Sequence, residues 1–490
     1  MRVLLIRPPK YLNGGLDTDT FNYAQPPVGI ASISAFLRSK GVDTEVLDLY
    51  FEGAGAAKQK LRNISAGLVG VTCISGEHQN ALDTAQFVKD NVKPAPFVVL
   101  GGPHVTVTKF DELILNSYPF VDFIIREEGE ISNFELIEAL EGKRDLDSVK
   151  GLSFRRNGRY TYNPDRPMLS NLDALPLPDY SFYDFSKNIG GNYDGHFFFR
   201  DVKSFKFAPI VSSRGCPNRC QFCSLFWGNN VRMRSAENVV EEIMALMRQF
   251  GIRHFSFFDD CFNISLERIE KFCQLVIERR LNISWTAMMR VKPVNSEILK
   301  TMNRAGCRGL CFGVESGSNR LLKSIKKNID TNEITRAFSL AREAGIMSKM
   351  LLMVGNMGET AQSIKESQLL IRRCKPTTVG ISPLVVLPNS DVYNSLLAKG
   401  KMDDTYWFTH SRAPIYTEEH SYDVLRYYRF KLLGSFYVST KGFFKLLKVF
   451  ILKFVFLILI KMRIEADSVK AGLHKYPWMR SLLGRFRTVD

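Results

Sequence analysis

The 490-residue sequence lacks an uninterrupted apolar run of the length that a membrane-spanning helix requires. The strictly apolar run after Lys453 has seven residues, whereas a spanning helix needs about twenty. We also expect no signal peptide, because Met1 leads directly into Val3–Ile6, an apolar run typical of a strand. We therefore expect a cytoplasmic protein in a reducing compartment, where disulfides are uncommon.

Acidic residues are scarce relative to basic ones, and the formal net charge is +16. From Ser421 to the end, 14 Lys and Arg stand against 4 Asp and Glu, and no recognised nucleic-acid motif accompanies them. We expect no nucleic-acid partner and interpret this basic, apolar tail as an element for peripheral association with the inner face of the membrane. For residues 443–464 we favour an interfacial helix over a helix packed on the protein and over a transmembrane anchor.

Cysteine is sparse, and only three of the nine cysteines cluster: Cys216, Cys220 and Cys223, in a C-x3-C-x2-C spacing. Thiolates this close together are typical metal ligands. A structural zinc site is closed by four protein ligands, whereas three cysteines on a 4Fe–4S cube leave one iron open to another ligand. We predict a 4Fe–4S cluster, over a zinc knuckle with a distant fourth ligand or chance core cysteines. The other six cysteines are expected to be small buried apolar residues.

Residues 1–140 alternate short apolar runs with helical patterns, which predicts a doubly wound parallel sheet of the Rossmann-like kind. The runs are Val3–Ile6, Glu45–Leu49, Leu68–Cys73, Phe97–Gly101 and Phe123–Arg126. In such sheets ligands bind beyond the carboxyl ends of the strands. The candidates there are Pro9, Thr72, Gly101, Gly102, Pro103, His104, Glu128 and Gly129, although ordinary strand–helix turns would also explain them.

Residues 141–206 are interpreted as a linker, with a β-hairpin around Asn157-Gly158 and a proline-rich extended strap at 172–180. Residues 207–390 repeat a strand–helix pattern six times, with strands near 207–213, 254–259, 283–289, 310–315, 348–354 and 378–386. This pattern predicts a partial (β/α)6 barrel. Residues 391–490 are predicted to form a helical, basic and apolar C-terminal region. Polar candidates fall at the carboxyl ends of the barrel strands, where barrels carry their chemistry: Asp259, Asp260, Arg290, Glu315, Ser316 and Gly355.

The cysteine loop, with Gly215, Pro217 and Phe222 around it, resembles the cluster loop of the radical S-adenosylmethionine (SAM) superfamily. The chain as a whole resembles the cobalamin-binding (class B) radical SAM enzymes. Stretches similar to that family are Pro26-Pro-Val-Gly-Ile30, Leu100-Gly-Gly-Pro-His-Val-Thr106, Arg126-Glu-Glu-Gly-Glu130, Phe257-Phe-Asp-Asp-Cys-Phe262, Gly313-Val-Glu-Ser-Gly-Ser318 and Val354-Gly-Asn-Met-Gly-Glu-Thr360. The chain departs from the family at Glu127, at Asn356-Met357 and at Pro388-Asn-Ser390, which are loop substitutions.

Two motifs known from relatives of this family are missing. No Asp-x-His-x-x-Gly occurs, so the sequence gives no sign of a histidine below the cobalt, and we interpret His78 and His104 as hydrogen-bonding loop residues. The three-cysteine N-terminal domain of methylthiotransferases is also absent, since Cys73 stands alone, which weakens a sulfur-insertion function.

The resemblance implies three cofactors: a 4Fe–4S cluster held by the three clustered cysteines, SAM on the open iron, and cobalamin in the first domain. The polar candidates at the barrel strand ends would then contact SAM, and the candidates at the strand ends of the first sheet, Glu128 among them, would contact cobalamin. It implies reductive cleavage of SAM to a 5′-deoxyadenosyl radical, an electron donor such as flavodoxin or ferredoxin, and methylation of an unactivated carbon in a small or lipid-like substrate. The alternatives are a non-methylating radical rearrangement or oxidative cyclase and, outside enzymes, a cobalamin-binding regulator or silent adaptor.

Overall fold

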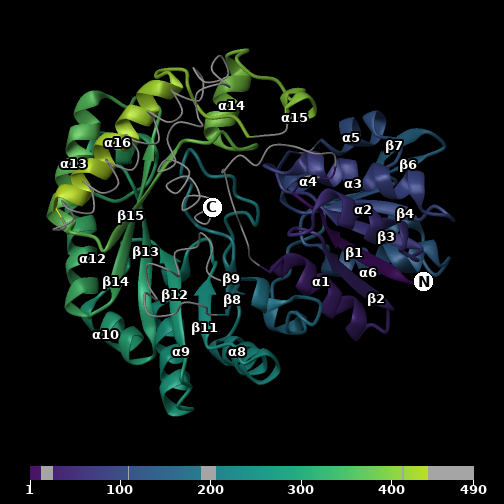
Figure 1. The fold of residues 1–490 in the computed structure, drawn as a ribbon, viewed down its shortest axis with the longest axis horizontal. Coiled ribbons are helices and arrows are strands. Elements are labelled where there is room, and N and C mark those ends of the chain that lie inside the picture. Colours follow the sequence, from purple (N-terminus) through teal and green to yellow (C-terminus); the bar gives the residue numbers. More distant parts are fainter. Residues whose placement is uncertain (11, 13–25, 109, 189–205, 411–412, 440–490) are drawn as a thin grey trace, which may run out of the picture. The chain divides into compact units, whose positions relative to one another are not determined.

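The computed structural model describes residues 1–490 except 11, 13–25, 109, 189–205, 411–412 and 440–490. The chain divides into two compact units, Met1–Leu432 and Leu433–Asp490, and the first unit contains both predicted sheets (Figure 1). The stretch 443–464, on which the interfacial-helix prediction rests, lies outside the described residues. Among the helices that the structure describes, none is both long and apolar enough to cross a membrane.

The first sheet has the strand order β2-β1-β3-β4-β5-β6-β7. Its first five strands are parallel, which confirms the predicted doubly wound sheet: β1 Val3–Arg7, β2 Thr44–Asp48, β3 Leu68–Thr72, β4 Phe97–Gly101 and β5 Phe123–Ile125. The helices are α1 Val28–Ser39, α2 Ala54–Arg62, α3 His78–Asn91, α4 Pro103–Thr108, α5 Asp111–Ser117 and α6 Gly129–Leu140.

Apolar side chains on both faces explain why these strands appear as continuous apolar runs in the sequence. In β1, Val3 and Leu5 join a core with residues of α1 and α6, whereas Leu4 and Ile6 join a second core with residues of α2, α3 and α5. The alternation follows from the two-residue repeat of a strand. Helices therefore cover both faces, and the carboxyl edge of the sheet is left for the strand–helix loops.

The predicted hairpin consists of β6 Leu152–Arg156 and β7 Arg159–Tyr162. Asn157 and Gly158 both have positive φ, of 49° and 78°, as a two-residue hairpin turn requires. Strand β6 pairs antiparallel with β5, so the hairpin extends the first sheet and is not confined to a separate linker. Short 3₁₀ helices flank the hairpin: η1 Leu146–Ser148 precedes it, and η2 Leu172–Ala174 and η3 Phe185–Asn188 follow it.

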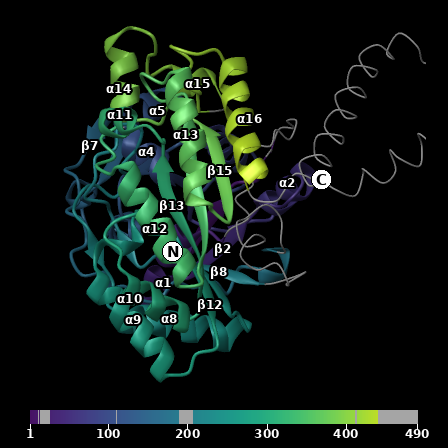
Figure 2. The same cartoon turned by 90° about the vertical axis from the view of Figure 1, so that its left-hand side faces the viewer.

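The second sheet has six parallel strands in the order β15-β14-β13-β12-β11-β8, as a partial barrel requires. The strands are β8 Phe207–Ile210, β11 His254–Phe257, β12 Ser284–Met289, β13 Cys307–Glu315, β14 Met347–Val354 and β15 Thr378–Pro383. The helices are α8 Ala236–Phe250, η4 Phe262–Ile264, α9 Leu266–Glu278, α10 Ser296–Arg304, α11 Asn319–Ser324, α12 Thr331–Glu343 and α13 Ala361–Cys374. Figures 1 and 2 show α9, α10, α12 and α13 on the outer side of this curved sheet.

After the barrel the chain returns to the first sheet. The segment after the barrel contains the helices α14 Asp391–Ala398, α15 Tyr406–Thr409 and α16 Tyr422–Ser439. Leu384, Trp407 and Tyr416 belong to the same buried core as Val71 of β3 and Leu100 of β4. One hydrophobic core thus joins the segment after the barrel to the first domain.

Candidate functional site

The three clustered cysteines lie in a loop between two short strands, β9 Ser213–Arg214 and β10 Arg232–Met233, which pair antiparallel. They are half-buried, whereas the other six cysteines are buried, as predicted for core residues. Gly215 has φ +94°, and a Cβ on it would lie 2.6 Å from the carbonyl oxygen of Asn230, so the start of the loop requires glycine. The Cys216 N–H donates to the Gly228 carbonyl at 3.2 Å, which closes the loop on itself.

Polar donors surround the cysteine sulfurs. Asn218 Nδ2 lies 3.5 Å from Cys216 Sγ, and Arg290 Nη1 lies 3.9 Å from Cys220 Sγ. A hydrogen bond from the Cys261 thiol, helped by Asn218 and by the charge of Arg290, lowers the pKa of Cys216 below its ordinary value. Burial raises the pKa of Cys223 to about 12. Cys261, expected only as a core residue, is buried and contacts the loop as well.

A soft thiolate set on one loop fits an iron–sulfur cluster. Within the described ranges no three His, Cys, Asp or Glu side chains are grouped so as to hold a single metal ion. Cysteines on a cube each bind a different iron, so they need not converge on one point. The assignment of Cys216, Cys220 and Cys223 as cluster ligands stays a prediction.

Asp259 supports the strand end that leads into the cysteine loop. Its Oδ1 accepts from the Ser212 N–H at 2.6 Å and the Ser213 N–H at 3.2 Å, and its Oδ2 accepts from Ser212 Oγ. Arg268 Nη2 lies 3.7 Å from Oδ2. Because these groups occupy both oxygens, Asp259 positions the loop in this structure, and its predicted contact with SAM remains untested.

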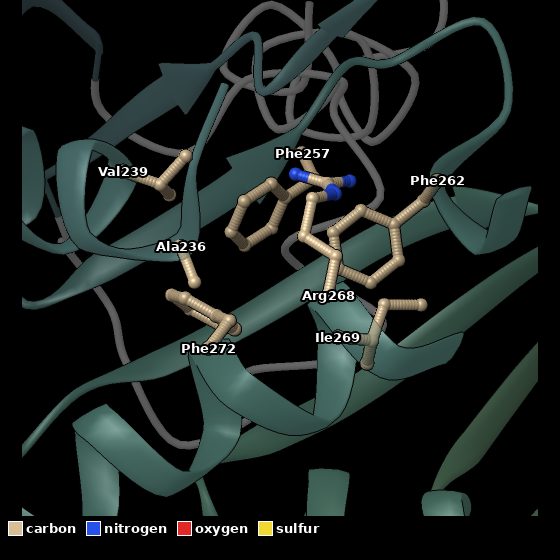
Figure 3. A pocket seen from close by; sticks show the side chains of 7 residues that line it. All are labelled: Ala236, Val239, Phe257, Phe262, Arg268, Ile269 and Phe272. Carbon is tan, nitrogen blue, oxygen red and sulfur yellow. The ribbon is translucent and has the colours of Figure 1, made fainter. Parts of the chain in front are cut away.

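The stem of Arg268 packs among aromatic side chains beneath this contact. Figure 3 shows Phe257, Phe262 and Phe272 around Arg268, in a hollow that leaves no room for a water-sized molecule. The hollow is therefore part of the packing and not a ligand site. Asp260, the neighbour of Asp259, lies beside the loop and keeps an exposed surface. Partial desolvation by the surrounding residues, reinforced by the charge of Cys216, raises its pKa above the ordinary value of 3.8 against the opposing hydrogen bond from the Gly215 N–H.

Arg290 and Glu315, at the ends of β12 and β13, are brought together through Lys327. Lys327 Nζ donates to Glu315 Oε1 at 2.8 Å in a buried ion pair, and the Lys327 carbonyl accepts from Arg290 Nη2. Lys327 Nζ also lies 5.5 Å from the ring centroid of Phe222 in the cysteine loop. Lys327 follows α11, a six-residue helix that was not predicted from the sequence pattern. A single lysine at this position carries no motif that would have identified it as a site residue.

The end of β13 carries local backbone strain. Glu315 has φ +68°, a left-handed conformation that non-glycine residues seldom adopt. The next residue, Ser316, is buried, and its Oγ accepts from the Ser318 N–H at 3.2 Å. Gly317 must be glycine, because a Cβ there would lie 2.4 Å from Ser367 Cα. This turn therefore holds Glu315 in one orientation beside the cysteine loop.

Gly355 at the end of β14 is held by a buried carboxyl group. Its N–H donates to Glu359 Oε2 at 2.6 Å, and Asn356 Nδ2 lies 3.5 Å from Oε1. Burial raises the pKa of Glu359 from its ordinary value of 4.5 to about 7, although both hydrogen bonds oppose the shift. The folded protein therefore favours the neutral carboxyl group.

This raised pKa predicts a pH-dependent contribution to stability. A folded-state pKa above the unfolded one means that the stabilisation is complete below about pH 4.5 and is lost as the pH rises through about 7. Glu359→Gln removes the titration, so the variant's stability relative to wild type should be higher at pH 8 than at pH 5, as measured by urea unfolding. Glu297→Gln, at an exposed side chain, is the control. An equal difference at both pH values would contradict the prediction.

The carboxyl edge of the first sheet brings Thr72 and Gly102 together. Gly102 has φ +103°, and a Cβ on it would lie 3.0 Å from Thr72 Oγ1 and from the Cys73 carbonyl. Gly101 and Pro103 flank it at the junction of β4 and α4. Hydroxyl and bare backbone groups at a sheet edge suit a large polar cofactor. Pro9, after β1, is buried and ends the neighbouring strand of the same sheet.

His104 is buried at this edge and stacks on His78, with ring centroids 4.8 Å apart. Its Nδ1 lies 3.3 Å from Ser75 Oγ. Burial lowers the pKa of His104 to about 3, so the imidazole is neutral. Trp407 packs edge-on to both rings, at 5.6 and 5.5 Å from their centroids. Trp407 could not be placed here from the sequence, because it lies some three hundred residues further along the chain.

Glu128 was predicted to contact cobalamin, but in this structure it faces the cysteine loop. Its Oε1 accepts from Arg214 Nη1 at 2.8 Å and Arg232 Nη1 at 2.6 Å, and its Oε2 accepts from the Leu169 N–H at 2.7 Å. Gly129 begins α6, where a Cβ would lie 3.0 Å from Ile33 Cδ1, so its role here is packing. The predicted cofactor contacts of both residues remain untested.

Comparisons with known proteins agree with this two-domain arrangement. The B12 binding domain family matches residues 16–137, and the radical SAM superfamily matches residues 210–371. An uncharacterized methyltransferase of Pyrococcus horikoshii is 32% identical over 371 residues, which are 74% of this chain and 76% of that protein. The anaerobic magnesium-protoporphyrin IX monomethyl ester cyclase of Rubrivivax gelatinosus is 28% identical over 82% of this chain and 71% of its own.

A solved structure shows the same fold. The radical SAM methyltransferase TsrM of Kitasatospora setae, with cobalamin and a [4Fe-4S] cluster bound, aligns with a TM-score of 0.65 at 20% identity over 81% of this chain and 75% of its own. The chain belongs to the cobalamin-binding (class B) radical SAM family. This membership confirms the predicted fold class and the three predicted cofactors: a 4Fe–4S cluster, SAM and cobalamin.

Proposed function

We propose that the chain is a radical SAM C-methyltransferase that acts on an unactivated carbon of a small-molecule substrate. One observation carries the proposal: the half-buried cysteine loop meets Arg290 and the Lys327–Glu315 pair at the carboxyl ends of β12 and β13. The chain that contains this loop also has a cobalamin-binding domain. Relatives named as methyltransferases support methylation, among them the cytidylyl-2-hydroxyethylphosphonate methyltransferase of Streptomyces wedmorensis, 24% identical over 70% of this chain.

Cys216, Cys220 and Cys223 would hold the cluster, and Arg290 would place a positive charge beside its sulfurs. When bound, the cofactors supply one-electron cleavage of SAM and transfer of a methyl group. Asp260, Glu315, Ser316 and Gly355 are the proposed partners of SAM. Ionised and hydrogen-bonding groups of this kind can orient the zwitterionic amino-acid part of SAM.

The edge of the first sheet at Pro9, Thr72, Gly101, Gly102, Pro103 and His104 would hold cobalamin. The buried, neutral His104 already contacts Ser75, which supports a packing role over ligation of cobalt. A one-electron donor of the flavodoxin or ferredoxin type would reduce the cluster. The proposed lipid-like substrate and membrane-surface association rest on residues 421–490 of the sequence alone.

A second candidate is an oxidative cyclase. It is favoured by the similarity to the anaerobic magnesium-protoporphyrin IX monomethyl ester cyclases, which extends over 82% of this chain in the Rubrivivax gelatinosus protein. A cyclase on this scaffold would use the same cysteine loop and SAM partners but would leave no new carbon–methyl bond in the product.

Isotope labelling separates the two candidates. The reconstituted protein is incubated under anaerobic conditions with a reductant, methyl-labelled SAM and candidate small molecules. A methyltransferase should form 5′-deoxyadenosine and S-adenosylhomocysteine together and should give a product that carries the label. Formation of 5′-deoxyadenosine with an unlabelled product that has lost hydrogen would establish the cyclase instead. No SAM cleavage with any substrate would overturn both.

A further inference from the structure

The cysteine loop is closed at its base by a very short ribbon. Strands β9 and β10 have two residues each, and Arg214 stands directly opposite Arg232 across the ribbon. Like charges opposite each other destabilise an antiparallel pair. Two residue pairs contribute little stability on their own, so this ribbon needs an external partner that neutralises both arginines.

The first domain supplies that partner at the start of α6. Arg214 donates through Nη1 to Glu128 Oε1 at 2.8 Å and through Nη2 to Glu130 Oε1 at 2.7 Å. Arg232 Nη1 donates to the same Glu128 oxygen at 2.6 Å. The two carboxylates balance the two guanidinium groups, and the exposed fractions of the four side chains are only 3–13%.

Neighbouring groups complete this four-residue network. Ser32 Oγ of α1 donates to Glu130 Oε1 at 2.8 Å. The Leu169 N–H, from the segment between the domains, donates to Glu128 Oε2 at 2.7 Å, and its carbonyl accepts from Arg232 Nη1 at 3.1 Å. The first domain, the linker and the base of the loop thus meet at one set of buried charges.

We propose that Glu128, Glu130, Arg214 and Arg232 form a positioning clamp, which fixes the base of the cysteine loop to the first domain and so fixes the separation of the two metal cofactors. The proposal rests on the proposed function only in placing the cluster in this loop and cobalamin in the first domain. A buried ion pair adds little net stability, because desolvation offsets the attraction, but its geometry is demanding. The guanidinium fork of Arg214, shared between two carboxylates, permits one arrangement where a lysine would permit several.

The test compares Glu128→Gln with a matched control in the full-length protein. Glu128→Gln keeps the side-chain shape and removes the charge. Glu242→Gln is the control, because Glu242, on α8 of the second domain, is equally buried and pairs with Arg234 of the same domain. Arg214→Lys is a milder second variant, which keeps the charge but cannot bond both glutamates with a fixed fork.

Two measurements are made, and neither needs a substrate. Amide hydrogen exchange in β9, β10 and the start of α6 should be faster by at least about tenfold in Glu128→Gln, because a buried charge has lost its partner. In protein reconstituted with iron, sulfide and cobalamin and then reduced, the magnetic interaction between the paramagnetic cluster and cobalt(II) reports their separation. Glu128→Gln should broaden the distribution of separations that this interaction reports, with iron and cobalamin contents unchanged. Arg214→Lys should broaden the distribution less, and Glu242→Gln should leave it as in wild type.

Several outcomes would overturn the clamp. An unchanged spin interaction in Glu128→Gln with both cofactors present would show that the network does not set their separation. Loss of cobalamin with unchanged exchange in the ribbon would make Glu128 a cobalamin contact instead. If wild-type protein itself bound neither cluster nor cobalamin, the proposed function would fail, and unchanged exchange in Glu128→Gln would then reject the clamp independently.

Discussion

Replacing any one of Cys216, Cys220 and Cys223 by alanine is expected to abolish SAM cleavage and to remove the visible absorbance of the cluster. The three cysteines are the proposed protein ligands, so a variant with two thiolates loses one anchored iron and with it the geometry of the open iron. The measurement is iron content, absorbance and formation of 5′-deoxyadenosine after anaerobic reconstitution with SAM and a reductant. Formation of 5′-deoxyadenosine should fall to the level of a reaction without protein.

Two further cysteine variants sharpen this experiment. Cys273→Ala removes a thiol that is fully buried on α9, so it should cost some stability through a small cavity and leave the cluster intact. Cys261→Ala removes the thiol that contacts Cys216 and tests whether Cys261 can serve as a ligand itself. A cluster that survives loss of a loop cysteine but disappears in Cys261→Ala would mean that the ligand set is wrong.

The sheets could be predicted from the sequence because their signal is local. Strands such as Leu68–Thr72 and Phe97–Gly101 are buried on both faces and therefore appear as short apolar runs between helical patterns. The six barrel strands were predicted to within a few residues for the same reason. Candidate polar residues at strand ends followed from topology, since the carboxyl ends of parallel strands share one edge.

The site's supporting contacts could not be predicted, because they join distant residues without any periodic pattern. Lys327 reaches Glu315 from a turn after an unpredicted helix, and Glu128 reaches Arg214 across 86 positions of the chain. Neither a single lysine nor a Glu-Gly-Glu sequence shows which charge it will meet. The predicted cofactor role for Glu128 was inferred from its position after β5. That position is confirmed, but it does not show which side chains Glu128 contacts.

Replacing Trp407 by alanine is expected to destabilise the first domain, although Trp407 lies after the barrel. The indole is 1% exposed and shares a core with Val71 and Leu100 of the first sheet. Its Nε1 donates to the Tyr393 hydroxyl at 3.3 Å, so the variant also loses a buried hydrogen bond. Removing a buried tryptophan costs about 3–5 kcal/mol. Since a chain of several domains need not unfold in one step, the effect is best measured locally, by hydrogen exchange.

Exchange of the amides in β3 and β4 should accelerate by roughly a hundredfold in Trp407→Ala, because the lost packing belongs to the core that these strands share. Trp407→Phe keeps an aromatic ring against His78 and His104 and should recover part of the protection. Tyr427→Ala, at a side chain that is 54% exposed, should change little. Faster exchange confined to α15 would mean that this helix packs on the first sheet without stabilising it. The shared core would then not couple the region after the barrel to the sheet edge proposed for cobalamin.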